Sequence, residues 1–434
     1  MQRLLIRGGR VLDPSQRLDR VTDLLVVDGK IAHIGDALDA EGIEGIDARG
    51  LWVVPGLIDT HVHLRTPGET HKETLESGSA AAAAGGFTTV VCMPNTRPPL
   101  DDVIRVEWLA ERAARSACVR VRIAAAISEG LDGQRLAPLG ALHEAGAVAF
   151  TDDGRPVADA ALMRRALELA ASLDVPVLIH AEEPALSRGG AMHEGPVADA
   201  AGMPGIPAAA EAVMVARDLL LAEQTGAHLH VLHVSAEQTV SLIRWAKARG
   251  IRVTAEVTPH HLLLTDEDVA ASGFDPNWKM NPPLRSAADR QALVAGLLDG
   301  TLDWIATDHA PHHPDDKTVP FPEAAFGIVG LETAAALILD AFVPAQLEPL
   351  RFVELLSTAP ARGLGLRGGT LAPGAPADIT LIDPEQVWTV DPTAFRSAAR
   401  NTPFAGRRLR GRVVRTIVGG RTVFAWPQGS EVSQ

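Results

Sequence analysis

The stretch GLIDTHVHLR, residues 56–65, is a largely apolar run that ends in two histidines, His61 and His63. In an extended strand side chains alternate in direction, so both imidazoles project from one face at a spacing that suits a single metal ion. Two histidines at this spacing also occur in ordinary strands. The apolar residues before them favour a barrel strand, because such strands present their chemistry at their carboxyl ends. We therefore expect partners for His61 and His63 at the ends of other strands.

Short apolar runs alternate with alanine- and leucine-rich segments through the middle of the chain. This alternation is typical of βα units around a parallel sheet. With eight such runs, the sequence predicts an α/β protein with a (β/α)8 TIM-like barrel. The expected strands cover residues 57–63, 88–93, 119–127, 147–151, 176–180, 228–233, 251–257 and 303–308. The expected helices include residues 72–86, 105–117, 161–173, 211–226 and 236–250.

The two ends of the chain have a different pattern, with short β-rich runs joined by Asp-Gly or Gly-Gly turns. Neither end has enough strands to bury a good hydrophobic face alone. We therefore expect one small composite β-sandwich domain from residues 1–54 and 365–434, with no chemistry of its own. Residues 55–364 would be inserted in it as a metal-dependent hydrolase barrel.

Composition excludes several classes of protein. The chain has 434 residues, 46% of them hydrophobic, which is enough for a barrel of roughly 250 residues and a second domain. A net charge of -14, spread along the chain, argues against nucleic-acid and membrane partners. No signal peptide or long apolar span is recognisable, so we expect a cytoplasmic protein. Cys92 and Cys118 have no thiolate-site spacing, so any metal must use nitrogen and oxygen ligands.

Polar residues gather at the carboxyl ends of five expected strands. These ends meet at one mouth of a barrel, so four histidines and at least one carboxylate would lie together, although each alone is ordinary at a strand end. In the sixth strand, alternation separates His228 and His230 from His233, which we take as the inward residue. The candidates are His61 and His63, Asp152 or Asp153 after the fourth strand, His180, His233 and Asp308.

This set of side chains suits zinc-assisted hydrolysis. Zinc binds imidazole nitrogen and carboxylate oxygen, and a catalytic site leaves one position open for water. Two ions roughly 3.5–4 Å apart can share a bridging carboxylate, activate a water and polarise a carbonyl. A carboxylate beside that water can take its proton and pass it to a leaving nitrogen. Asp308 is the candidate for this acid and base role.

Seven short motifs then follow one another along nearly the whole chain. They are HVHLR (61–65), MPNT (93–96), FTDDG (150–154), HVS (233–235), MNPPLR (280–285), ATDHAPH (306–312) and GIVGLET (327–333). Together they resemble the type I dihydroorotases of the amidohydrolase superfamily. The resemblance implies metal ligation by His61, His63, Asp153, His180, His233 and Asp308. Many relatives carry a carboxylated lysine where this chain has Asp153, so the number of zinc ions, one or two per chain, stays open.

The resemblance also implies a reaction. Dihydroorotases interconvert N-carbamoyl-L-aspartate and L-dihydroorotate in de novo pyrimidine (UMP) biosynthesis. Both compounds carry a carboxylate, and Arg65 can supply a bidentate clamp for it. A proline-rich loop, residues 310–324, is a candidate lid. The implied substrate contacts are His63, Arg65, Asn95, Asn281, His312 and backbone groups of Phe326 and Gly327.

Two alternative functions fit part of the sequence. Another cyclic amidohydrolase, hydantoinase-like or allantoinase-like, would share the barrel and the metal, but Arg65 with Asn95 and the missing lysine argue against it. A non-catalytic dihydroorotase-like scaffold for aspartate transcarbamoylase would lose metal ligands, and this chain keeps all of them. We expect a homo-oligomer. Association with aspartate transcarbamoylase, as in some type I members, is a hypothesis that the sequence does not decide.

Overall fold

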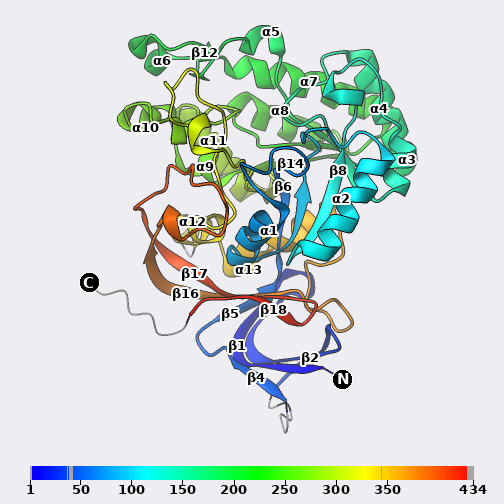
Figure 1. The fold of residues 1–434 in the computed structure, drawn as a ribbon, viewed down its shortest axis with the longest axis vertical. Coiled ribbons are helices and arrows are strands. Elements are labelled where there is room, and N and C mark those ends of the chain that lie inside the picture. The colour runs from blue at the N-terminus through cyan, green and yellow to red at the C-terminus, as the bar shows by residue number, and fades with distance from the viewer. Residues whose placement is uncertain (1, 37, 39–42, 344, 428–434) are drawn as a thin grey trace.

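In the computed structural model, which describes residues 2–36, 38, 43–343 and 345–427, a barrel lies on a terminal β-sheet (Figure 1). The eight parallel barrel strands follow chain order around the barrel, from β6 to β15. The segment after β15 returns to β6, where the backbone N–H of His63 donates to the carbonyl of His309 at 2.9 Å. This contact nearly closes the barrel, so the predicted fold class is confirmed.

All eight predicted barrel strands are present, with ends that differ from the predicted ones by a few residues. Their carboxyl ends share one mouth, where the chemistry of such barrels is placed. The strands are β6 (Leu57–Val62), β7 (Phe87–Cys92), β8 (Arg120–Ala125), β9 (Ala147–Phe150), β10 (Val177–Ile179), β13 (Leu229–Val231), β14 (Val253–Val257) and β15 (Trp304–Ile305).

The five predicted helices correspond to α1, α2, α4, α7 and α8. Helix α1 begins at Leu75 rather than at residue 72, because Thr74 and Ser77 cap each other's backbone N–H groups at 3.0 Å. The helices are α1 (Leu75–Ala84), α2 (Val103–Ser116), α3 (Leu139–Glu144), α4 (Ala160–Leu173), α5 (Pro184–Ser187), α6 (Pro196–Ala201), α7 (Ala208–Thr225), α8 (Glu237–Ala248), α9 (Pro259–Leu263), α10 (Asp266–Ala271), α11 (Ala287–Asp299), α12 (Ala334–Phe342), α13 (Pro349–Val353) and α14 (Ala359–Gly363). A short pair, β11 (Met192–His193) and β12 (Gly205–Ile206), lies outside the barrel.

Strands from both chain ends share one sheet. Strand β5 pairs with β1 on one side and with β16 on the other. Hydrogen bonds join the strands of the predicted β domain into one continuous sheet around a shared core that includes Leu24, Val53 and Ile379. The strands are β1 (Arg3–Asp13), β2 (Leu18–Val27), β3 (Lys30–Gly35), β4 (Glu44–Asp47), β5 (Trp52–Pro55), β16 (Ile379–Thr389), β17 (Arg408–Val418) and β18 (Arg421–Ala425).

The terminal sheet is attached near the amino ends of the barrel strands. Arg120, at the start of β8, forms an ion pair with Asp378 at 2.7 Å. The hydroxyl of Thr380 donates to the carbonyl of Gly86, just before β7, at 2.6 Å. The mouth formed by the carboxyl ends of the strands is therefore free of the sheet. Among the described residues, no helix has the length and apolarity needed to cross a bilayer.

Candidate active site

Four predicted metal ligands meet where β6, β9 and β15 end. His61 Nε2 lies 3.4 Å from an oxygen of Asp153 and 3.4 Å from Asp308 Oδ1. His63 Nε2 lies 3.0 Å from Asp308 Oδ1 and 3.5 Å from Asp153 Oδ2. All four side chains are buried. The alternation of β6 thus places both imidazoles against the same two carboxylates, as the sequence predicted.

The other two predicted ligands lie near the same oxygen of Asp153 that His61 approaches. Its Oδ1 is 3.6 Å from His180 Nδ1 and 3.7 Å from His233 Nε2. The neighbouring carboxylate of Asp152 points elsewhere and accepts backbone N–H groups of Ile127 and Ser128 at 2.8 and 3.0 Å. Asp153 therefore lies among all four imidazoles, and Asp152 anchors the loop after β8.

The donor set fits a divalent metal. Three overlapping triads of ligand atoms lie close enough to hold an ion: His61 with His233 and Asp308, His61 with His63 and Asp153, and Asp153 with His180 and His233. His61 Nε2 and Asp153 Oδ1 are buried without a hydrogen-bond partner, although polar atoms in such places normally have one. An ion between them would satisfy both atoms.

Electrostatics at the site also favours a cation. Burial lowers the pKa of His61, but Asp308 and Asp153 outweigh burial and raise it well above its ordinary value. Burial also lowers the pKa of His180, but the neighbouring Asp153 favours the charged ring. The net effect raises the pKa of His180 to about 10. Burial would raise the pKa of Asp308, but His61 and His63 lower it to about 2. Both carboxylates are therefore ionised and attract positive charge to this point.

Three site residues end their strands in an uncommon backbone conformation. Arg65, His233 and Asp308 have φ angles of 53°, 31° and 47°. Positive φ is rare for residues with a side chain and concentrates at functional sites. At these positions the backbone turns away from the strand direction at the barrel mouth.

The Arg65 side chain lies at the same mouth and is almost completely buried. Its Nε donates to the carbonyl of Pro311 at 3.1 Å, and Nη2 lies 3.5 Å from His312 Nε2. Within the described part of the chain, no carboxylate forms an ion pair with Arg65. Its charge is therefore available for an anion that enters the site.

Comparisons with known proteins agree with this geometry. Residues 50–239 match the family described as Dihydro-orotase-like. A dihydroorotase from Anaeromyxobacter sp. (strain K) is 52% identical over 421 residues, which covers 97% of each chain. A dihydroorotase from Pelotomaculum thermopropionicum is 53% identical over 422 residues, covering 97% of this chain and 98% of that relative. The chain belongs to the dihydroorotase family.

Solved structures place the dihydroorotase fold among cyclic amide hydrolases. The L-hydantoinase (dihydropyrimidinase) from Arthrobacter aurescens superposes with a TM-score of 0.88 at 29% identity, covering 98% of this chain and 96% of that one. A D-hydantoinase (dihydropyrimidinase) from Thermus sp. gives a TM-score of 0.84 at 28% identity, over 97% and 95% of the two chains. The predicted family, barrel fold and class of enzyme are confirmed.

In this dihydroorotase, Asn95 and Asn281 contact predicted metal ligands or their neighbours. Asn95 Oδ1 lies 2.9 Å from His63 Nδ1, and its Nδ2 lies 3.4 Å from Asp153 Oδ2. Asn281 Nδ2 donates to Glu182 at 2.7 Å, and the same carboxylate oxygen lies 3.1 Å from His180 Nε2. Both amides thus border the group of predicted metal ligands and orient imidazoles, a role that the sequence did not suggest, and their contact with substrate stays a prediction.

The candidate lid places its predicted residues beside Arg65. His312 Nε2 lies 2.8 Å from the carbonyl of Phe326. Burial, followed by the nearby charge of Arg65, lowers the pKa of His312 to about 3, so the ring is neutral. Gly327 has a φ of 150°, and a Cβ there would meet the carbonyl of Ala310 at 2.8 Å. Only glycine therefore lets the backbone of this loop lie so close to the lid.

Two buried lysines that the sequence analysis missed hold the lid in place. Lys317 Nζ donates to the carbonyls of Ala325 and Pro276 at 2.6 and 3.0 Å. Lys279 Nζ donates to the carbonyl of Pro322 at 2.8 Å. Burial lowers the pKa of Lys317 to about 7 and that of Lys279 to about 8. Nothing in the local sequence distinguishes these lysines from exposed ones, because their acceptors come from two segments, around residue 276 and over residues 322–325.

Glu256, within β14, is a further residue that sequence analysis missed. Its Oε1 lies 2.9 Å from His61 Nδ1, and its Oε2 lies 3.1 Å from His230 Nε2. It also accepts the hydroxyl of Thr60 at 2.6 Å. The carboxylate fixes the His61 ring so that Nε2 points into the metal cluster. An acidic residue near the carboxyl end of a predicted strand was the available signal.

Replacing Glu256 with Gln should weaken metal binding. A neutral amide makes His61 a poorer ligand and orients it less firmly, so we expect metal affinity to fall by about 10–100-fold. Competition with a chromogenic chelator measures this change. Glu237→Gln, at the exposed start of α8, is the control and should bind metal as the unmodified chain does. Equal affinity in Glu256→Gln would show that the carboxylate does not support the ligand.

Proposed function

We propose that this chain catalyses the reversible cyclisation of N-carbamoyl-L-aspartate to L-dihydroorotate in pyrimidine biosynthesis. The main observation that supports this proposal is a buried His/Asp cluster at the barrel mouth. Arg65 lies at the same mouth and has no carboxylate partner among the described residues. Relatives that are 52% and 53% identical over 97% of the chain are named dihydroorotase, which supports the same reaction.

We further propose zinc as the metal, one or two ions per chain. His61, His63, Asp153, His180, His233 and Asp308 would hold it. When bound, zinc polarises a carbonyl and lowers the pKa of a coordinated water. The convergence of imidazoles and ionised carboxylates supports such an ion.

Side chains carry out the proton transfer and the binding of the substrate. In ring opening, Asp308 accepts the proton of the attacking water and then delivers it to the departing amide nitrogen. Arg65 binds the substrate carboxylate and so fixes the ring in front of Asp308. The backbone groups of Phe326 and Gly327 form hydrogen bonds with the ring amide of the substrate, and His312 packs beside Arg65. Ring closure follows the same steps in reverse.

Metal removal tests the proposal directly. After treatment with a zinc chelator, we expect dihydroorotate hydrolysis to fall by about 100-fold or more and to return when zinc is added. The metal-free chain should also unfold at a lower temperature, because the ion stabilises only the folded state. Elemental analysis before and after treatment gives the stoichiometry. Turnover that persists in chains shown to be free of metal would rule out the proposed site.

Hydantoin hydrolysis is the second candidate activity, because the structural neighbours include hydantoinases at 29% and 28% identity. Hydantoin has no carboxylate, so it leaves the buried charge of Arg65 without a partner. We therefore expect dihydroorotate to be the preferred substrate. Parallel measurements of kcat/KM for the two compounds decide between them, and a higher value for hydantoin would reject our assignment.

In our proposal the chain divides into two domains, only one of which carries the site. We propose residues 55–364 as the hydrolase barrel, and residues 1–54 with 365–434 as the composite β domain. The shared sheet of β5 and β16 supports this division. A homo-oligomer, cytoplasmic location and association with aspartate transcarbamoylase stay predictions, and sedimentation of the chain alone and with that partner tests two of them.

A further inference from the structure

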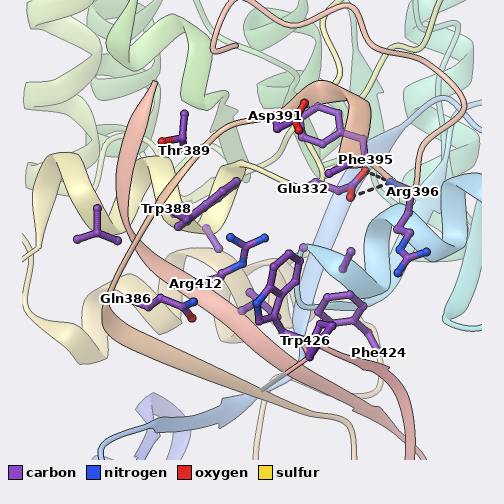
Figure 2. Close-up of a pocket in the computed structure, with 18 of the residues that line it drawn as sticks. Glu332, Gln386, Trp388, Thr389, Asp391, Phe395, Arg396, Arg412, Phe424 and Trp426 are labelled. Atoms are coloured by element: carbon purple, nitrogen blue, oxygen red, sulfur yellow. Dashed lines mark hydrogen bonds between the residues drawn. The ribbon is translucent and has the colours of Figure 1, made fainter. Parts of the chain in front are cut away.

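A hollow of about 910 Å³ lies where α1 and α12 meet β16, β17 and β18, away from the predicted metal ligands (Figure 2). This volume is typical of pockets for small molecules. Aromatic side chains form much of its wall, namely Trp388, Phe395, Phe424 and Trp426. Trp388 is fixed by its Nε1, which donates to the carbonyl of Gly411 at 2.9 Å. None of the residues assigned above to metal or substrate lines this hollow.

Arg412 is one of the arginines that line the hollow, and it lies between two indole rings (Figure 2). Its guanidinium carbon is 4.3 Å from the ring centroid of Trp388 and 3.4 Å from that of Trp426. Stacking covers the faces of a guanidinium but leaves the N–H donors along its edge free. Among the described residues, none accepts a hydrogen bond from this side chain or pairs with its charge. The edge is therefore a free bidentate donor.

The charges around the hollow favour an anion. Three arginines, Arg396, Arg408 and Arg412, line it together with two acidic residues, Glu332 and Asp391. The Glu332 carboxylate is already occupied, since it accepts the backbone N–H of Arg396 at 2.9 Å and that of Ser397 at 3.1 Å. The formal charge of the lining is therefore slightly positive, whereas the whole chain has a net charge of -14.

One wall of the hollow is held rigidly. The segment that carries Arg396 is bound by Glu332 and also by the buried Glu73. Glu73 accepts the backbone N–H of Ala398 at 3.0 Å and the hydroxyl of Ser397. A site whose walls are fixed beforehand loses little conformational entropy when a ligand enters.

We propose that this hollow is a second binding site, for a small planar aromatic anion such as an aryl carboxylate. The carboxylate would accept two hydrogen bonds from the edge of Arg412, and the ring would pack against Phe395 and Phe424. Charge-assisted bidentate pairs of this kind are strong and directional. The apolar wall supplies area for the ring, and aromatic contacts favour a flat molecule over a branched one.

Calorimetric titration of the zinc-loaded chain with 2-naphthoate tests the proposal. We expect saturable binding at one site and a Kd at least about tenfold higher in Arg412→Met. Arg415→Met is the matched control, because Arg415 lies on the same strand and lines a different hollow. Its Kd should stay within about twofold of the unmodified chain. Unchanged kcat and circular dichroism would show that the Arg412 variant is folded.

Neutral 2-naphthamide gives a second test that needs no variant. It keeps the ring and removes the charge, so we expect it to bind the unmodified chain at least about tenfold more weakly than 2-naphthoate. Equal affinities for the two compounds, no binding of 2-naphthoate, or equal Kd values with and without Arg412 would each overturn the proposal. Binding lost instead in an Arg65 variant would assign the anion to the metal site and overturn it as well.

Discussion

Replacing Asp308 with Asn should lower kcat for dihydroorotate hydrolysis by about a thousandfold, because an amide cannot accept the proton of the attacking water. The carboxylate lies 3.0 Å from His63 and 3.4 Å from His61, and both lower its pKa, so it is ionised and ready to take a proton. Because Asp308 is also a proposed metal ligand, the variant is assayed at saturating zinc. Steady-state kinetics and elemental analysis on one preparation separate the two effects.

Asp315→Asn is the control for this experiment. Asp315 lies in the lid, and its side chain is 89% exposed, so its kcat should match that of the unmodified chain within about twofold. A metal-loaded Asp308→Asn enzyme whose kcat fell less than about tenfold would move the proton transfer to another group. Loss of metal at saturating zinc would show that the ligand role of Asp308 accounts for the lost activity, and it would contradict a separate acid and base role.

The barrel could be predicted because its pattern is local. An apolar run of a few residues followed by a helix is visible in any window of the sequence, and parallel strands bring their carboxyl ends together without further information. This is why His61, His63, His180 and His233 could be placed at one mouth before any coordinates were known. The residue type and its position at the end of a strand were together sufficient to predict this grouping.

The choice between Asp152 and Asp153 depended on more than the local pattern. Strand β9 ends at Phe150, so both residues lie in the loop beyond it and alternation says nothing about their directions. In the structure, Asp152 is held by backbone N–H groups of the loop after β8, and Asp153 is left to face the imidazoles. Such a difference is set by contacts between segments, which sequence spacing does not contain.

The residues that support the site could not be identified from the sequence, because their partners lie in distant segments. Asp59 accepts the hydroxyl of Thr307, which follows the last barrel strand, at 2.5 Å, and so joins the strand of His61 to the segment of Asp308. Glu256 reaches His61 across the barrel interior. These pairs are more than 190 positions apart in the sequence. A single sequence shows each residue but not its partner.

Replacing Arg65 with Met should raise KM for dihydroorotate by about 100-fold while kcat changes by no more than about threefold, since the lost bidentate pair acts on bound substrate and transition state alike. Lys should rescue this loss only partly, because a point charge does not reproduce the planar fork. The structure supports the expectation through the position of Arg65: it is buried at the barrel mouth, and Pro311 and His312 leave part of its guanidinium for a ligand.

Arg97→Met supplies the matched control for Arg65→Met. Arg97 and Arg65 both line a hollow of about 380 Å³ beside Asn95. The Arg97 side chain is 80% exposed, so it can only attract the substrate at long range. Its KM should therefore rise by less than about threefold at physiological ionic strength. A similar rise in KM for both variants would mean that the substrate carboxylate is held by long-range attraction to positive charge and not by bidentate hydrogen bonds from Arg65. A fall in kcat without a change in KM would place Arg65 in the chemical step, and the substrate clamp would then have to be sought among the other residues of the mouth.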